Sequence, residues 1–105
     1  MPKEIVVLIT TPSLKEARTI GRKLVEEKLA ACVNIIPQIA SLFHWQGKIC
    51  RERESLMVIK TQRSCFDRLV KRVKSLHSYS VPEIIALPII RGSKDYLRWI
   101  RTATR

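Results

Sequence analysis

Apolar residues follow two different periods along this chain, and the change between them predicts the order of the elements. Runs of consecutive or alternating apolar residues, a pattern typical of strands, occupy residues 3–10, 31–36 with 39–45, 49–61 and 83–90. Apolar residues three or four apart, with charged residues between them, predict helices over residues 13–29, from about 64, and briefly after 93. The predicted order is therefore strand, helix, strand, strand, helix, strand, with a short helix at the end.

Capping and turn residues support these boundaries. Ser13 and Glu16 have the spacing of a helix-capping box. Pro37 cannot donate a hydrogen bond within a strand, so it predicts a bulge or a bend in the second strand. Gln46-Gly47-Lys48 predicts a turn that joins the second and third strands into a long hairpin. Pro88 places the fourth strand at a sheet edge, and Gly92-Ser93 precedes the last helix.

This order predicts one α+β domain over residues 1–105, with the ferredoxin-like βαββαβ fold and an antiparallel sheet. We expect the first and third strands to be central, and the helical crossovers to make these two strands parallel. The second and fourth strands are expected at the edges.

The strands do not alternate apolar and polar residues, as a sheet with one wet face should. Neighbouring positions that point to opposite faces are both apolar, as in Val7 and Leu8, Met57 and Val58, or Ile84 and Ile85. Both main helices cover one face in this fold, so an apolar second face remains. A monomer seldom exposes such a patch, and the sequence therefore predicts self-association.

Composition narrows the classes of protein further. The chain has 105 residues, 46% of them hydrophobic, with no apolar run long enough for a membrane helix and no apolar N-terminal stretch, so we expect a cytoplasmic protein. Its formal net charge of +11 favours anionic partners, although solvated helix faces explain the same excess. Three scattered cysteines without a CxxC pair predict free thiols.

Short motifs in a fixed order resemble the CutA family along nearly the whole chain. They are Thr10-Thr11-Pro12, Leu29 to Ile35, Phe43-His44-Trp45-Gln46-Gly47, Ile59-Lys60-Thr61, His77-Ser78-Tyr79 with Val81-Pro82-Glu83-Ile84, and Tyr96-Leu97-x-Trp99. The resemblance implies a ferredoxin-like subunit, a homotrimer and a link to tolerance of divalent metals, copper among them. It implies a binding or regulatory protein with sites between subunits.

The sequence departs from the family at three positions. Leu76 stands where some members have the first of two histidines, Ser78 where the family has proline, and Ile9 where some members have cysteine. A metal site built from those groups would keep only His77 in this chain.

Two groups of candidate site residues follow. His77 is the first candidate ligand for copper or another divalent cation, with Cys32 or Glu83 as possible partners. The alternatives are that His77 closes a helix end and that Cys32 is a packing residue. Lys60, Tyr79 and Glu83 are expected to form either an ion pair between subunits or part of a ligand pocket. A metal ion or a small anion is the expected type of ligand. Trp45 and Trp99 are expected to pack at subunit interfaces.

Two other function classes remain as alternatives. An RNA-binding module shares this topology and a basic charge, but the first and third strands lack the aromatic residues on which bases stack. A nucleic-acid partner is therefore not expected. A small enzyme with a pocket between subunits is the second alternative. No nucleophile–base pair and no glycine-rich phosphate loop is visible, so we do not expect an enzyme.

Overall fold

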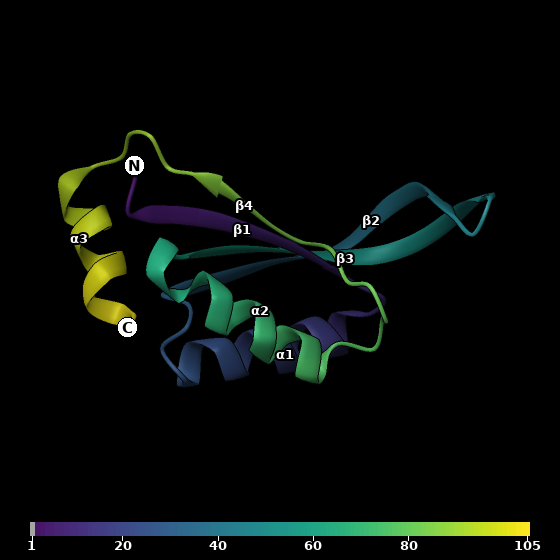
Figure 1. The fold of residues 1–105 in the computed structure, drawn as a ribbon, viewed down its shortest axis with the longest axis horizontal. Coiled ribbons are helices and arrows are strands. Elements are labelled where there is room, and N and C mark those ends of the chain that lie inside the picture. The colour runs from purple at the N-terminus through teal and green to yellow at the C-terminus, as the bar shows by residue number, and fades with distance from the viewer. Residues whose placement is uncertain (1) are drawn as a thin grey trace.

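The structure, a computed structural model, describes residues 2–105 (Figure 1). Four strands and three α-helices form an α+β fold in the predicted order, with a 3₁₀ turn at Arg63–Cys65 before the second helix. The elements are β1 (Glu4–Thr11), α1 (Leu14–Glu26), β2 (Cys32–Trp45), β3 (Lys48–Gln62), α2 (Phe66–Leu76), β4 (Ile84–Pro88) and α3 (Lys94–Ala103).

The strand order is β2-β3-β1-β4, so the first and third strands are central and the other two lie at the edges, as predicted. The expectation that β1 and β3 are parallel is wrong, because they pair antiparallel from Glu4 opposite Gln62 to Thr11 opposite Ser55. The physical reason lies in the hairpin. After the crossover through α1, β2 runs in the same direction as β1, with one strand position left between them. The hairpin then reverses the chain, so β3 occupies that position and runs opposite to both neighbours.

Local chemistry explains both ends of α1. Ser13 is the N-cap, and its hydroxyl oxygen accepts a hydrogen bond from the Glu16 backbone N–H at 3.1 Å. At the other end Lys28 takes a left-handed φ of 60°. The Leu29 N–H bonds back to the Leu24 carbonyl and the Lys28 N–H to the Val25 carbonyl, which is the Schellman arrangement. The helix therefore ends slightly before the predicted residue 28 or 29.

The hairpin has the predicted bulge and turn. The pairing of β2 with β3 shifts register between Ile36 and Ile39, around Pro37, and the Ser55 hydroxyl donates to the Pro37 carbonyl at 2.7 Å. Gln46 and Gly47 both have positive φ, which is the conformation of a two-residue type I′ turn. The hairpin extends well past β1 and gives the molecule its long dimension of 44 Å (Figure 1).

Helices α1 and α2 lie side by side on one face of the sheet (Figure 1). The core lies between them and the strands, and its fully buried members include Val7, Ile9, Leu24, Ile59 and Leu69. We call the opposite face of the sheet the open face. Apolar side chains from β1, β3 and β4 lie on it: Val6, Leu8, Leu56, Val58, Ile85 and Leu87. None of these six residues is fully buried, and Ile85 and Leu87 are each 50% exposed.

Helix α3 closes the end of the sheet at which β1 begins (Figure 1). Arg101 on α3 forms an ion pair with the buried Glu4 at 2.8 Å, and the Gln62 side-chain amide donates to Thr104 Oγ1 at 2.9 Å. Ser93 is the N-cap residue of α3, but its side chain makes no capping bond. None of the helices in residues 2–105 has the length and apolar character that a membrane crossing requires.

Candidate functional site

His77 lies at the C-terminal end of α2 with its side chain fully enclosed. Its Nε2–H donates to the Thr10 carbonyl at 2.7 Å, and its Nδ1 accepts from the Tyr79 backbone N–H at 3.0 Å. These two bonds select the neutral tautomer with the proton on Nε2. The Glu16 carboxylate lies 3.3 Å from Nδ1 and accepts from both the backbone N–H and the hydroxyl of Ser78. His77 therefore joins the end of β1 to the loop after α2.

Tyr79 extends this network toward the hairpin. Its hydroxyl donates to Glu54 Oε2 at 2.8 Å, and its ring lies 4.9 Å from that of His77. Glu54 is buried, at the point where β3 runs beyond the end of β1. Burial raises the pKa of the Tyr79 hydroxyl above its ordinary value of 10.0, and the hydrogen bond to the Glu54 carboxylate raises it further. The hydroxyl therefore keeps its proton and acts as a donor at neutral pH.

A second polar cluster lies at the other end of the sheet, beside α3. Lys60 faces Cys32 across the β2–β3 pair, and its ammonium group donates to the Asn34 side-chain oxygen. The Cys32 thiol lies 3.6 Å from the same oxygen. Tyr96 of α3 reaches this cluster: burial raises the pKa of its hydroxyl, and contact with Cys32 raises it further. We call Cys32, Asn34, Lys60 and Tyr96 the lysine cluster.

The structure does not bring all the predicted site residues together within one chain. Tyr79 binds Glu54, six residues from Lys60 along β3, a span of roughly 20 Å in a strand. Glu83 is exposed just before β4. The two tryptophans lie at opposite ends of the molecule: Trp45, 44% exposed, is at the hairpin tip, and Trp99, 43% exposed, is on α3 against Tyr96.

The two predicted metal ligands are also apart. Cys32 belongs to the lysine cluster, whereas His77 contacts the far end of β1. Within residues 2–105 no group of three or more His, Cys, Asp or Glu side chains is arranged to hold a metal ion. Cys32, Cys50 and Cys65 are all free thiols. Any complete metal site that uses these residues would need a ligand from a second copy or a local rearrangement.

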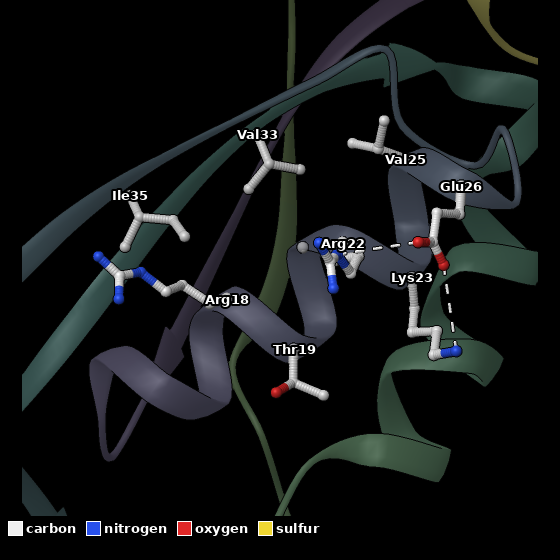
Figure 2. A pocket seen from close by; sticks show the side chains of 9 residues that line it. Arg18, Thr19, Arg22, Lys23, Val25, Glu26, Val33 and Ile35 are labelled. Carbon is white, nitrogen blue, oxygen red and sulfur yellow. Dashed lines mark ion pairs between the residues drawn. The ribbon is translucent and has the colours of Figure 1, made fainter.

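A groove of about 800 Å³ runs between α1 and the edge strand β2 (Figure 2). Val33 and Ile35 of β2 line one side, and the Arg18 side chain extends toward Ile35 across it. Arg22 and Lys23 are both within reach of Glu26, at 3.8 and 4.0 Å. The groove has an apolar wall and a basic rim, and its lining includes none of the candidate site residues predicted from the sequence.

Sequence reasoning missed four residues of the two networks: Glu16, Glu54, Asn34 and Tyr96. Glu16 was recognised only as a capping residue, yet its carboxylate binds the loop after α2. Asn34 and Tyr96 appeared only within family motifs. Asn34 contacts Lys60, which is 26 positions away along the chain, and Tyr96 contacts Cys32, which is 64 positions away. The signal that could have found Asn34 is that a polar residue interrupts an apolar strand beside the strand that carries Lys60.

Comparison with known proteins identifies the family. The family model described as "CutA1 divalent ion tolerance protein" matches residues 5–103. The divalent-cation tolerance protein CutA of Thermus thermophilus is 54% identical over 96% of this chain and 98% of the relative. The human protein CutA is 50% identical over 91% of this chain, but the aligned region covers only 54% of the human protein. The chain therefore spans nearly all of the bacterial relative and about half of the human one.

Solved structures agree with these sequence matches. The Thermus thermophilus divalent cation tolerance protein superposes with a TM-score of 0.95 at 53% identity, over 97% of this chain and 99% of the other. An Archaeoglobus fulgidus protein, described as a periplasmic divalent cation tolerance protein CutA, gives 0.94 at 45% identity over the same shares. The ordered motifs, the four-stranded sheet with its long hairpin and these matches lead to one conclusion: the chain belongs to the CutA1 divalent ion tolerance protein family.

Proposed function

We propose that this chain is a homotrimeric, cytoplasmic protein that contributes to tolerance of divalent metal ions, copper among them. It acts by binding or regulation rather than catalysis, through sites completed between subunits, and residues 1–105 act as a single CutA-like domain. The names of the relatives support the link to divalent cations. Three free thiols suit the reducing conditions of the cytoplasm.

The apolar open face is the observation that carries the assembly. Ile85 and Leu87 on this face are half-exposed, and Leu42 and Ile49 on the hairpin are 70% and 71% exposed. Removing such apolar area from water contributes roughly 25 cal/mol per Å². The hairpin adds an unpaired edge, because β3 continues from Ser55 back to Lys48 without β1 beside it. A second copy can cover the apolar face and pair with this edge.

His77 stays the predicted metal ligand, and the structure defines what metal binding there requires. A metal at Nδ1 must displace the Tyr79 N–H, because that nitrogen has a single lone pair. The Glu16 carboxylate, 3.3 Å away, could supply a second ligand. Cys32 stays a prediction as a separate ligand. Glu83 and Trp45, which are exposed, and Trp99 on α3 are available for contacts with another subunit.

Two measurements on the purified protein test this function. Light scattering is expected to give a mass of three times 12.1 kDa at micromolar concentration. Calorimetric titration with copper(II) and with zinc is expected to show binding that His77→Ala weakens by at least about tenfold, since loss of a metal ligand or its support has effects of this size. His44→Ala is the matched control, because His44 is exposed on the hairpin and should leave the affinity unchanged.

A monomeric mass would contradict the assembly and, with it, the sites between subunits. Metal binding that is equal in the wild type and the His77→Ala variant would remove His77 from the site. If neither copper(II) nor zinc binds saturably, the metal-binding role is overturned, even if the protein is a trimer.

A further inference from the structure

The lysine cluster contains a positive charge without a carboxylate partner. Lys60 lies on the sheet face that α1 and α2 leave uncovered, directly beside Val6 on β1 and two positions from Val58 on β3. It is half-buried, and none of the ion pairs formed within residues 2–105 includes it. An ammonium group that apolar neighbours shield from water attracts an anion more strongly than a fully solvated one.

The other members of the lysine cluster, Cys32, Asn34 and Tyr96, include no carboxylate and offer hydrogen-bond donors. The ammonium of Lys60 and the thiol of Cys32 both point to the Asn34 side-chain oxygen, so this acceptor is occupied. The amide NH₂ of Asn34 and two N–H bonds of Lys60 remain free to donate. Tyr96 adds a hydroxyl group beside Cys32. A cluster with surplus donors and one positive charge matches the acceptor oxygens of an anion.

We propose that Lys60, Asn34, Cys32 and Tyr96 form a binding site for a small oxyanion, either a carboxylate or a phosphate group. The ammonium of Lys60 opposes a cation at the same place, so this site differs in chemistry from the metal site proposed at His77, and it is an alternative to the metal-ligand role predicted for Cys32. Its residues come from β2, β3 and α3 of one chain. The inference therefore goes beyond the proposed function and requires no metal ion. Because Lys60 lies on the open face beside Val6, the site borders the surface that a second copy covers in the proposed trimer.

Calorimetric titration of the full chain tests this site. Inorganic phosphate is the probe in one arm and acetate in the other, both at an ionic strength held constant with chloride. We expect saturable binding in at least one arm, and the arm with the higher affinity tells whether the site prefers phosphate or carboxylate. Lys60→Gln should weaken this binding roughly ten- to hundredfold, which is the effect of losing a hydrogen bond to a charged group.

Three further variants separate a local site from the overall charge. Lys15→Gln makes the same change of charge on the first turn of α1, where Lys15 is exposed, and should bind as the wild type does. Lys60→Arg keeps the charge and should retain most of the affinity. Asn34→Asp places a carboxylate beside the Lys60 ammonium, so it should abolish binding even if Lys60→Gln fails to fold.

Several results would overturn the proposal. One is the absence of saturable binding to both phosphate and acetate. Another is an equal loss of affinity in Lys15→Gln and Lys60→Gln, which would mean that the anions respond only to net charge. A third is unchanged binding in Asn34→Asp. None of these results depends on the trimer mass or on metal affinity, so the proposed function stands or falls separately.

Discussion

Single side chains hold the loop after α2 against the sheet. His77 uses both ring nitrogens, one on the Thr10 carbonyl and one on the Tyr79 N–H, and Tyr79 uses its hydroxyl on Glu54. Two of these partners, Thr10 and Glu54, lie on strands of the sheet and are distant from the loop in sequence. Their loss would leave buried polar groups without partners, which costs about 1–3 kcal/mol per group.

Tyr79→Phe is expected to change how stability depends on pH. The folded state raises the Tyr79 pKa, so above pH 10.0 the unfolded chain releases a proton that the folded chain retains. The free energy of unfolding of the wild type must therefore fall as pH rises beyond this value. In the Phe variant this contribution is absent, and its stability should fall less steeply. Urea denaturation at several pH values between about 9 and 11, around the ordinary tyrosine pKa, measures the difference.

Urea denaturation of the same two proteins near neutral pH provides a control. Near neutrality Tyr79→Phe should be less stable than the wild type by about 1.5–3 kcal/mol, because Glu54 loses a donor to a charged acceptor. The stability gap between the two proteins should then narrow as pH rises. Parallel curves across the alkaline range would show that Tyr79 has an ordinary pKa in the folded state.

Among the elements, the hairpin of β2 and β3 depends most on local backbone conformation. Its turn places Gln46 at φ 50° and Gly47 at φ 78°, both in the left-handed region. No other part of the structure lies within 4 Å of where a Gly47 side chain would begin. The requirement for glycine is therefore conformational and not steric.

Gly47→Ala should destabilise the protein by about 1–2 kcal/mol, the strain of a residue with a Cβ atom in the left-handed conformation. Gln46→Asn is the opposite change at the neighbouring position, because asparagine tolerates this conformation better than glutamine. Denaturant unfolding at one fixed protein concentration should rank Gln46→Asn above the wild type and Gly47→Ala below it. Equal stability of the Ala variant and the wild type would contradict the type I′ turn.

At the scale of the whole molecule, the sheet has one face under α1 and α2 and one face without helices (Figure 1). Ile85 on the open face and Val25 on α1 are exposed to similar extents, 50% and 45%. In an isolated subunit the two positions would therefore respond alike to a charged substitution. If the open face is an interface, only Ile85 becomes buried.

Ile85→Glu is thus expected to lower the mass measured by light scattering, because an unpaired carboxylate at a buried interface costs several kcal/mol. Val25→Glu, with the same change of charge, should keep the mass of the wild type. A smaller mass for the Val25 variant alone would place the interface on the helix side of the sheet instead.

The periodic patterns and turn residues of the sequence were sufficient to predict the elements, their order, the bulge at Pro37 and the turn at Gln46–Gly47. These features depend on a few neighbouring residues, so their cause is contained in short segments. The order of strands in the sheet, with β1 and β3 central, also followed from the sequence. The apolar character of both sheet faces was also predictable, because it depends on neighbouring positions within each strand.

The tertiary structure alone decided which distant residues meet. The antiparallel direction of β1 and β3 depends on how the crossover and the hairpin combine, and it sets every pair across the sheet. Tyr79 and Glu54 are 25 positions apart, and Lys60 and Asn34 are 26 apart. The candidates His77 and Tyr79 therefore lie in one cluster, and Lys60 and Cys32 lie in another at the opposite end of the sheet. Register, and not proximity along the chain, determines which polar groups share one environment.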